Sequence, residues 1–363
     1  MKKISTLSFL IILINFSCSK DTVAEDDFIN SPDTTGLYFP PISSDDWETM
    51  TITDLGWNTE AEKSLYDFLE ENDTKSFIIL KNGKIAVEQY FNGSDIDDSN
   101  PWFSVGKTLT AFTIGIAQQE GLLDINSSSS TYLGNGWAAI TSEQENAITV
   151  KHHLTMTTGL DYSVSNNCTD PDCLTFLNPP EDFWYYHTAA YTLLTEMVAN
   201  AANLEYATYF DTRLKNKIGM SGNWVSLGYA NVYYSNARSM ARFGLLNLNK
   251  GNWNTTEILT DQNYFTEMTT TSQSLNQSYG YLWWLNGKSS SRIPGSTGEF
   301  SGSLIPDAPD DMIAGLGLND QKLYIVPSQN LVVVRMGNSA GQDVLGPSSF
   351  DNELWIKINA LIQ

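Results

Sequence analysis

Two apolar, β-rich runs in the first third of the chain predict a β-hairpin. They are Ser76–Lys81 and Lys84–Phe91, and the dipeptide Asn82-Gly83 separates them. Asn-Gly suits a tight two-residue hairpin turn because both positions of that turn need a positive φ. The hydrophobic pattern therefore places two paired antiparallel strands at 76–91.

The sequence predicts a helix on each side of this hairpin. Ahead of it, Thr59–Glu62 matches a capping box, which predicts a helix that begins at this point. Behind it, an apolar stripe at helical spacing predicts a second, amphipathic helix from about Ser104 to a stop at Gly121.

The remainder divides into a mostly helical stretch and a second group of strands. Residues from about 124 to 275 read as helices and loops. Three short apolar runs then predict strands: Met312–Leu318, Lys322–Val326 and Leu331–Met336. A final helix is expected at Phe350–Ile362. We therefore predict an α+β fold, in which both chain ends contribute to one antiparallel sheet flanked by helices and the helical stretch is an inserted subdomain.

The N-terminus has the pattern of a secretory leader. Lys2 and Lys3 precede an apolar run, Leu7–Ile14, which is too short to span a membrane. Ser17-Cys18 follows and resembles a bacterial lipobox. We predict a signal peptide at 1–17, a lipid anchor on Cys18, a flexible tether at 18–55 and one domain at 56–363. The chain would then lie in a bacterial cell envelope; ordinary secretion with a coincidental cysteine is the alternative.

The remaining cysteines, Cys168 and Cys173, lie close together around a turn-forming Thr169–Asp172 segment. Outside the cytosol such a pair favours a disulfide. Two free thiols, or a metal site with the neighbouring aspartates, are the alternatives.

Composition narrows the partners without naming a substrate. The net charge of -22 argues against nucleic acids and against a basic membrane-binding face. The three histidines, His152, His153 and His187, show no metal-ligand spacing, so we expect neither a metal nor a cofactor. His152 and His153 are expected on a helix surface and His187 in a loop, with a place lining the pocket as its alternative.

Candidate chemistry starts with Ser104 and Lys107, three residues apart at a predicted helix start. This spacing puts both side chains on one helix face. A serine hydroxyl needs an adjacent base, and a lysine becomes one when burial lowers its pKa. Ser-x-x-Lys also occurs at Ser17–Lys20, so the spacing is a weak signal alone.

Further segments make Ser104 a stronger candidate, because several family-like motifs occur in order. Together they resemble the serine β-lactamase-related superfamily, which includes class C β-lactamases, penicillin-binding DD-peptidases, esterases and aminohexanoate-oligomer hydrolases. The similar segments are Trp102–Lys107, Leu154–Leu160, Phe183–Leu194, Ala241–Leu246, Tyr279–Trp284 and Gly315–Gly337. The resemblance covers roughly Gly56 to Gln363 and implies the β-lactamase/transpeptidase-like fold.

The resemblance implies roles for individual residues. Ser104 would attack a carbonyl to form an acyl-enzyme, and Lys107 and Tyr186 would share the proton transfers, with the choice of base between them open. Tyr185 is the alternative if the alignment slips by one. The amides of Ser104 and Leu318 would form the oxyanion hole.

Two departures from the family pattern affect the expected substrate. Thr188 stands where the second motif has Asn. The third motif, aligned to Gly315-Leu316-Gly317, lacks its Lys or His, which in β-lactamases meets the substrate carboxylate. Thr188, Gly315 and Gly317 are expected at the substrate. Trp283 and Trp284 either wall the cleft or pack in the core.

The sequence therefore predicts a serine hydrolase, an esterase or amidase for a small molecule. The alternatives are an enzyme acting on β-lactams or peptidoglycan peptides, and an inactive lipoprotein that only binds a ligand. The oligomeric state is left open.

Overall fold

The computed structural model describes residues 36–341 and 345–363. The predicted leader (1–17), the predicted lipidation site Cys18 and the tether up to residue 35 lie outside these residues. Among the described residues, no helix has the length and apolar character to cross a membrane.

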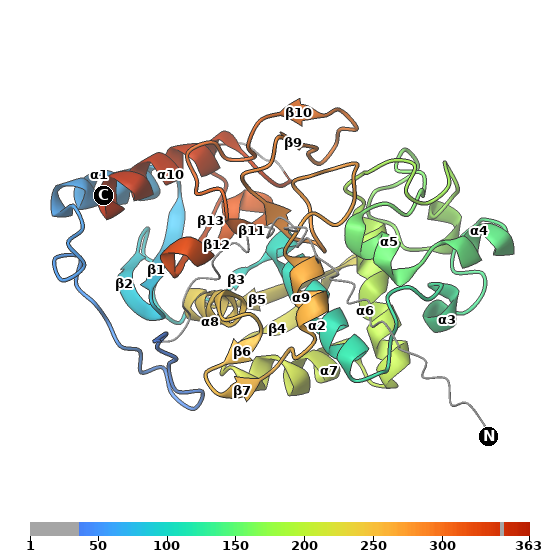
Figure 1. The fold of residues 1–363 in the computed structure, drawn as a ribbon, viewed down its shortest axis with the longest axis horizontal. Coiled ribbons are helices and arrows are strands. Elements are labelled where there is room, and N and C mark those ends of the chain that lie inside the picture. The colour runs from blue at the N-terminus through green and yellow to red at the C-terminus, as the bar shows by residue number, and fades with distance from the viewer. Residues whose placement is uncertain (1–35, 342–344) are drawn as a thin grey trace, which may run out of the picture. The chain divides into compact units, whose positions relative to one another are not determined.

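Figure 1 shows the helices and strands of the described residues, which follow one another along the chain mostly in separate runs of strands and of helices. The α-helices are α1 (Thr59–Glu71), α2 (Gly106–Gln119), α3 (Ser130–Leu133), α4 (Ser142–Ala147), α5 (Val150–Thr155), α6 (Thr188–Ala202), α7 (Tyr206–Arg213), α8 (Ala237–Leu248), α9 (Gln262–Met268) and α10 (Ser349–Ile362). The strands are β1 (Thr74–Lys81), β2 (Lys84–Tyr90), β3 (Asn100–Pro101), β4 (Asn223–Leu227), β5 (Ala230–Ser235), β6 (Asn252–Trp253), β7 (Thr256–Glu257), β8 (Trp284–Leu285), β9 (Ser290–Ser291), β10 (Phe300–Ser301), β11 (Ile313–Gly317), β12 (Gln321–Val326) and β13 (Leu331–Gly337).

The main sheet joins the two ends of the chain, which confirms the predicted α+β architecture. Its strand order is β2-β1-β13-β12-β11-β8, with antiparallel pairs throughout. The N-terminal hairpin pairs with the C-terminal strands through β1 and β13, where Ile79 lies opposite Val333. The turn at Asn82-Gly83 has a positive φ at both residues, as the hairpin prediction requires.

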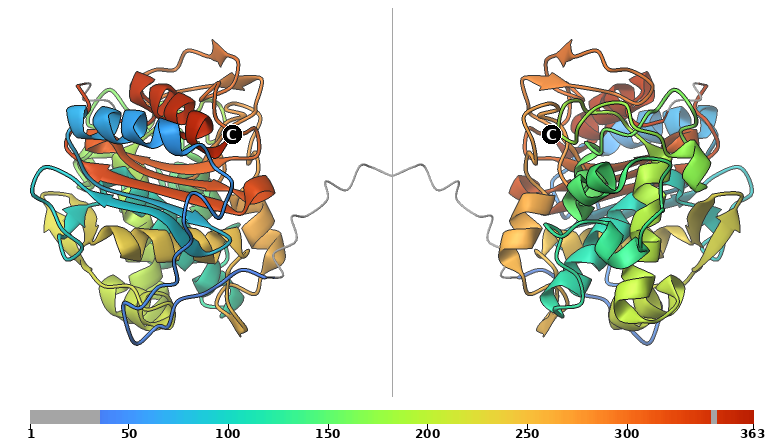
Figure 2. Two further views of the ribbon diagram at one scale, coloured as in Figure 1. Left: turned by 90° about the vertical axis from the view of Figure 1, so that its left-hand side faces the viewer. Right: turned by 90° about the vertical axis from the view of Figure 1, so that its right-hand side faces the viewer.

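Helices cover both faces of this sheet. α1 and α10 pack together on one face, and α8 packs against β12 and β13 on the other (Figure 2). Burial on two faces explains why β13 is buried at every residue and is apolar except for the buried Arg335.

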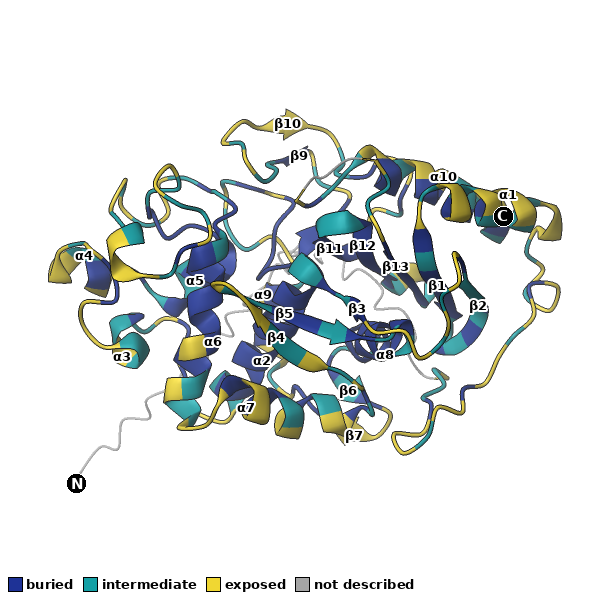
Figure 3. Ribbon diagram, turned by 180° about the vertical axis from the view of Figure 1, so that it is seen from behind, coloured by how far each residue is buried: buried dark blue, intermediate teal, exposed yellow. Residues whose placement is uncertain are grey.

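The helix α2 is more deeply buried than its predicted amphipathic pattern implied. Every residue from Gly106 to Ala117 is buried, as Figure 3 shows in dark blue. Three buried threonine hydroxyls in this helix would be costly without hydrogen bonds. Thr108, Thr110 and Thr113 donate to backbone carbonyls three or four residues earlier. A helix enclosed in this way holds its first turn in a fixed position.

The inserted region is mostly helical, but it also contains strands that the sequence pattern did not predict. It contains β4 and β5, a hairpin around Gly228-Tyr229, and β5 pairs in turn with β3. Three of the five β4 residues, Asn223, Ser226 and Leu227, are exposed, so the strand lacks the apolar run that marks the central sheet.

Residues 36–55 are also not a free tether. The Trp47 side chain is buried and donates to the Gly83 carbonyl at 2.8 Å, and Thr49 pairs with Ile85. The Arg242 guanidinium binds the carbonyls of Pro41 and Ser44. The helix α1 starts at Thr59 as expected, but Asn58 rather than Thr59 is its cap.

Cys168 and Cys173 form the predicted disulfide, with an S–S distance of 2.04 Å. Asp170 lies near both sulfur atoms. Because a disulfide has no thiolate to offer, this cluster does not make the alternative metal site.

A buried ionic network lies between the sheet and α10. Lys322 on β12 contacts Asp351 of α10 at 2.8 Å and Asp320 at 3.1 Å, and the side chains of Lys322 and Asp351 are completely buried. The Tyr324 hydroxyl donates to the same Asp351 carboxylate at 2.5 Å. A charge in such a place needs all its partners.

We therefore expect Asp351→Ala to destabilise the protein by about 3 kcal/mol, because it leaves a buried lysine partly unpaired. Urea unfolding checks this value. Asp67→Ala is the control, since it removes the exposed Lys63–Asp67 pair and is expected to leave the stability almost unchanged. Equal losses in the two variants would contradict the assignment.

Candidate active site

Ser104 lies in a short turn of 3-10 helix, Phe103–Val105, that leads directly into α2. The preceding Trp102 is fully buried and anchors this turn. Its indole donates to the Ser235 hydroxyl at 2.8 Å, and its amide donates to the Tyr233 carbonyl at 2.8 Å. Phe103 has a φ of 45°, a costly conformation for a bulky residue. The aromatic pair therefore holds the serine in a strained, well-fixed turn.

Lys107 lies one helical turn after Ser104 and points at it. Its Nζ is 3.1 Å from the Ser104 Oγ, and the residue is only 3% exposed. Burial lowers the pKa of Lys107 to about 7. Within the described residues it makes no ion pair with a carboxylate, which would oppose that shift.

Two tyrosine rings enclose the Lys107 ammonium. Its Nζ lies 4.2 Å from the centre of the Tyr191 ring and 4.9 Å from that of Tyr186. Burial raises the pKa of the Tyr186 hydroxyl well above its ordinary value, and a hydrogen bond with Ser104 acts in the opposite direction. The structure thus brings together three groups that can pass a proton: a serine, a lysine close to neutrality and a protonated phenol.

Tyr186, and not Tyr185, faces the serine. Tyr186 is buried and stacks on Trp284 with their ring centres 5.9 Å apart. Tyr185 stacks instead on Tyr162, with centres 3.8 Å apart. The aromatic cluster around position 186 therefore serves both packing and the site.

The end of strand β11 lies against the serine turn. A Cβ atom at Gly317 would lie 2.6 Å from the Trp102 carbonyl oxygen and 3.2 Å from the Ser104 amide nitrogen. Only glycine permits this approach without displacing the turn. The next residue, Leu318, lines the same cleft as Ser104. This close approach brings the backbone after the third motif to the side of Ser104.

A cleft of about 410 Å³ opens above Ser104 and Lys107. The other described residues that line it are uncharged: Phe103, Asn167, Thr188, Tyr191, Leu227, Gly228, Tyr229, Ala230, Asn231, Val232, Leu318 and Leu345. Thr188, which was predicted at the substrate, is one of these lining residues. Within residues 36–341 and 345–363, Lys107 is the only charged side chain in this lining.

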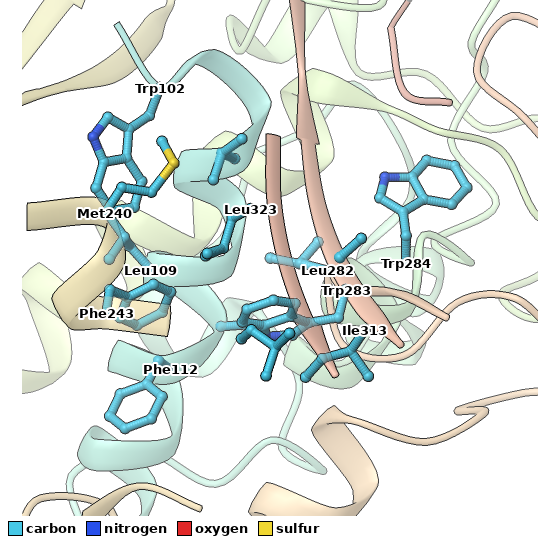
Figure 4. Close-up of a cluster of buried hydrophobic side chains, with 14 of the residues drawn as sticks. Trp102, Leu109, Phe112, Met240, Phe243, Leu282, Trp283, Trp284, Ile313 and Leu323 are labelled. Carbon is cyan, nitrogen blue, oxygen red and sulfur yellow. The ribbon is translucent and has the colours of Figure 1, made fainter. Parts of the chain in front are cut away.

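Trp283, Trp284 and Gly315, which were considered as substrate contacts, are not among the residues that line the cleft, and the two tryptophans pack in the core. Trp283 is fully buried among core residues such as Phe243, with ring centres 6.1 Å apart (Figure 4). Trp284 stacks on Tyr186, and Gly315 faces Val105 of the serine turn and Thr108 of α2. These residues therefore affect the site through packing and not through a place in the cleft lining.

The histidines are not at the serine. His187 caps α6, where its Nδ1 accepts from the Ala190 amide at 3.1 Å, so its loop interpretation holds. His153 was expected on a surface but is completely buried, with its Nδ1 2.7 Å from the Ala190 carbonyl oxygen. Neither residue appears in the lining of the cleft.

The hairpin of β4 and β5 is the part of the cleft that sequence reasoning missed. Residues 227–232 supply almost half of the lining. The signal was present as Leu227-Gly228-Tyr229 between two β-rich runs, which is a turn pattern. The hairpin was not recognised as strands because its residues are partly exposed and of mixed polarity.

Comparison with known proteins places this geometry in context. The family model described as Beta-lactamase matches residues 70–353. An uncharacterized protein of Alkalihalophilus pseudofirmus is 24% identical over 305 residues, which are 73% of this chain and 84% of that protein.

Solved structures show the same fold at low sequence identity. A protein of Bacillus anthracis provisionally named 6-aminohexanoate-dimer hydrolase matches with a TM-score of 0.66 and 19% identity, over 89% of this chain and 88% of that one. A provisionally named beta-lactamase of Bacteroides dorei matches with a TM-score of 0.66 and 14% identity, over 84% of this chain and 99% of that one. A penicillin-binding protein homologue of Pyrococcus abyssi matches with a TM-score of 0.61 and 14% identity, over 85% of this chain and 78% of that one.

The lowered pKa of Lys107 predicts a pH dependence for modification of Ser104. The neutral amine is the basic form, so its fraction rises as pH increases through about 7. We expect fluorophosphonate labelling of Ser104 to accelerate about tenfold between about pH 6 and about pH 8, and then to level off.

Intact-mass measurement of the labelling rate checks this profile. Lys107→Arg keeps a permanent charge and is expected to be slow and independent of pH in this range. Burial lowers the pKa of His153 to about 3 and that of His187 to about 4, so neither would produce a rise near 7. A rise that persists in Lys107→Arg would contradict the role of the lysine.

Proposed function

The chain belongs to the beta-lactamase family, and on that premise we propose that it is a serine hydrolase that cleaves an ester or amide through an acyl-enzyme at Ser104. The observation that carries the proposal is the contact of 3.1 Å between the Ser104 Oγ and a buried Lys107 whose pKa is lowered to about 7. Lys322, which is equally buried, is instead paired with the carboxylate of Asp351.

In the acylation step, the Ser104 Oγ attacks the carbonyl carbon and its proton passes to the neutral Lys107 amine. The C–O bond to the enzyme forms, and the carbonyl oxygen takes the negative charge. The amides of Ser104 and Leu318 would stabilise that charge. This hole is supported by the close packing of Gly317 on Ser104.

The leaving group then needs a proton as its bond breaks. Tyr186 is suited to this step because burial raises the pKa of its hydroxyl, which stays protonated at neutral pH. Its proton is replaced from the Lys107 ammonium, whose Nζ lies beside the Tyr186 ring. Water then attacks the acyl carbonyl by the reverse route and releases the acid and free Ser104.

The cleft supports a substrate without a carboxylate near the reacting bond. A bound carboxylate would need a cation to replace its hydration. Among the described lining residues, the only cation is Lys107, which is engaged with Ser104. We therefore place an uncharged ester or amide ahead of β-lactams as the substrate class.

We also propose a location in the bacterial cell envelope, with a lipid anchor at Cys18. The disulfide between Cys168 and Cys173 supports an oxidising compartment. Retention of the chain in membrane fractions, and its release in Cys18→Ser, is the expected result.

Variants of the three proton-transfer residues test the proposed reaction on p-nitrophenyl acetate. Ser104→Ala is expected to abolish turnover and labelling. Lys107→Ala is expected to lower kcat by about 10³ and Tyr186→Phe by about 10², because each loses a general acid or base. Lys151→Ala is the control, since Lys151 pairs with Glu267 away from the cleft lining.

Nitrocefin separates the two substrate classes in the same assay. We expect its kcat/KM to be at least about a hundredfold below that of the acetate ester, because no cation meets its carboxylate. Turnover of the ester by Ser104→Ala would contradict the acyl-enzyme, and rapid nitrocefin hydrolysis would contradict the substrate class.

A further inference from the structure

One hydrogen bond connects two segments that line the cleft near Ser104. The hydroxyl of Tyr229 donates to the carboxylate of Asp170. Tyr229 lies at the turn between β4 and β5 and lines the cleft. Asp170 lies inside the disulfide loop, three residues after Asn167, which also lines the cleft.

The disulfide loop is anchored beside Tyr186. The Asn166 side chain accepts from the Thr188 amide at 3.1 Å, and its carbonyl accepts from the Ala189 amide at 2.8 Å. The Cys168–Cys173 bond then closes the loop around Asp170. Because its base is tied to the start of α6, the position of Asp170 is set relative to the catalytic tyrosine.

The hairpin on the other side is anchored to the nucleophile turn. β5 pairs with β3, and the Tyr233 carbonyl accepts from the Trp102 amide at 2.8 Å. Tyr229 is therefore carried by the element that holds Ser104. We call the Tyr229–Asp170 hydrogen bond the bridge. It joins the hairpin that holds the Ser104 turn to the loop that is anchored beside Tyr186, and neither of its side chains takes part in the proposed reaction.

We propose that the Tyr229–Asp170 bridge closes one end of the cleft and sets the length of the uncharged group that the substrate places there. Tyr229 would then be a specificity-determining residue. The inference rests on the proposed hydrolase function. Leu227 and Val232 line the cleft beside Tyr229, so the group that fits is short and apolar.

The bridge is expected to add little to the stability of the fold, so its proposed effect is on the space in the cleft. Tyr229 is 46% exposed, and an exposed hydrogen bond to a carboxylate adds little to stability. Its pKa is raised by the hydrogen bond and by the charge of Asp170, so the phenol keeps its donated proton at neutral pH. Removing the bridge should change selectivity and leave the fold intact.

Two fluorophosphonates that differ only in alkyl chain, ethyl and octyl, provide the test, with p-nitrophenyl acetate and octanoate as the matching esters. The measured quantity is the long-to-short ratio of labelling rates and of kcat/KM. Using a ratio cancels any general loss of activity. We expect Tyr229→Ala to raise both ratios at least about tenfold, because the ring no longer blocks the end of the cleft.

Finer variants separate the ring from the hydrogen bond. Tyr229→Phe and Asp170→Ala keep the aromatic ring but remove the hydrogen bond that holds it. Each is expected to raise the long-to-short ratio about threefold. Asp170→Asn keeps an acceptor oxygen and should retain the wild-type ratio. Replacing both Cys168 and Cys173 by Ser should act like Asp170→Ala, because Asp170 loses its anchor.

Tyr209→Phe is the matched control. It removes a tyrosine hydroxyl that also donates to a carboxylate, that of Glu120 at 2.9 Å, but Tyr209 does not line the cleft. Its ratio should equal that of the wild type. Thermal unfolding of every variant confirms that the fold is retained.

The outcomes distinguish this inference from the proposed function. An unchanged ratio in folded Tyr229→Ala, with Ser104 still labelled, would overturn the bridge and leave the hydrolase proposal standing. A failure of both probes and both esters to react at Ser104 in the wild type would overturn the hydrolase proposal, and this inference with it.

Discussion

Burial of the Lys107 ammonium beside Ser104 is the interaction on which the rest of the site depends. A lysine removed from water and given no carboxylate loses much of its preference for the charged form, which lowers its pKa to about 7. The faces of Tyr186 and Tyr191 partly offset this cost by stabilising the remaining charge. Among the described residues, Lys107 is thus a buried amine that contacts tyrosine rings and makes no ion pair with a carboxylate, which allows it to become neutral near pH 7.

The surrounding fold buries most of that side chain, places no described carboxylate in contact with its amine, and holds its partners in position. α2 is buried along its first three turns, Trp102 ties the serine turn to β5, and Gly317 lets β11 lie against the Ser104 amide. On the far face of the same sheet, Lys322 shows the opposite arrangement. It is equally buried but paired with two carboxylates, which suits a structural charge. The contrast between the two lysines is the physical basis for assigning chemistry to only one of them.

The cleft belongs to several segments that are distant along the chain. The nucleophile helix, the start of α6, the end of β11 and the β4–β5 hairpin each contribute to its lining. The hairpin and the disulfide loop are surface elements joined by the Tyr229–Asp170 hydrogen bond. Surface elements tolerate change better than the core does, so these two are suited to adjusting which substrate the proposed site accepts.

Local patterns were enough to predict the hairpin at 76–91, the strands after residue 312 and the Ser104–Lys107 pair, because each depends on spacing within a few residues. Family-like motifs added Tyr186 and Thr188. The depth of Lys107, the choice of Tyr186 over Tyr185 and the placement of Trp283 in the core depend on contacts between distant segments. So do the packing of residues 36–55 and the hairpin that lines the cleft. Burial and pKa arise from everything that surrounds a side chain, and the chain pattern specifies only its neighbours in sequence. Local spacing therefore indicated which groups could react, and tertiary packing decided their protonation, their orientation and the space left for a substrate.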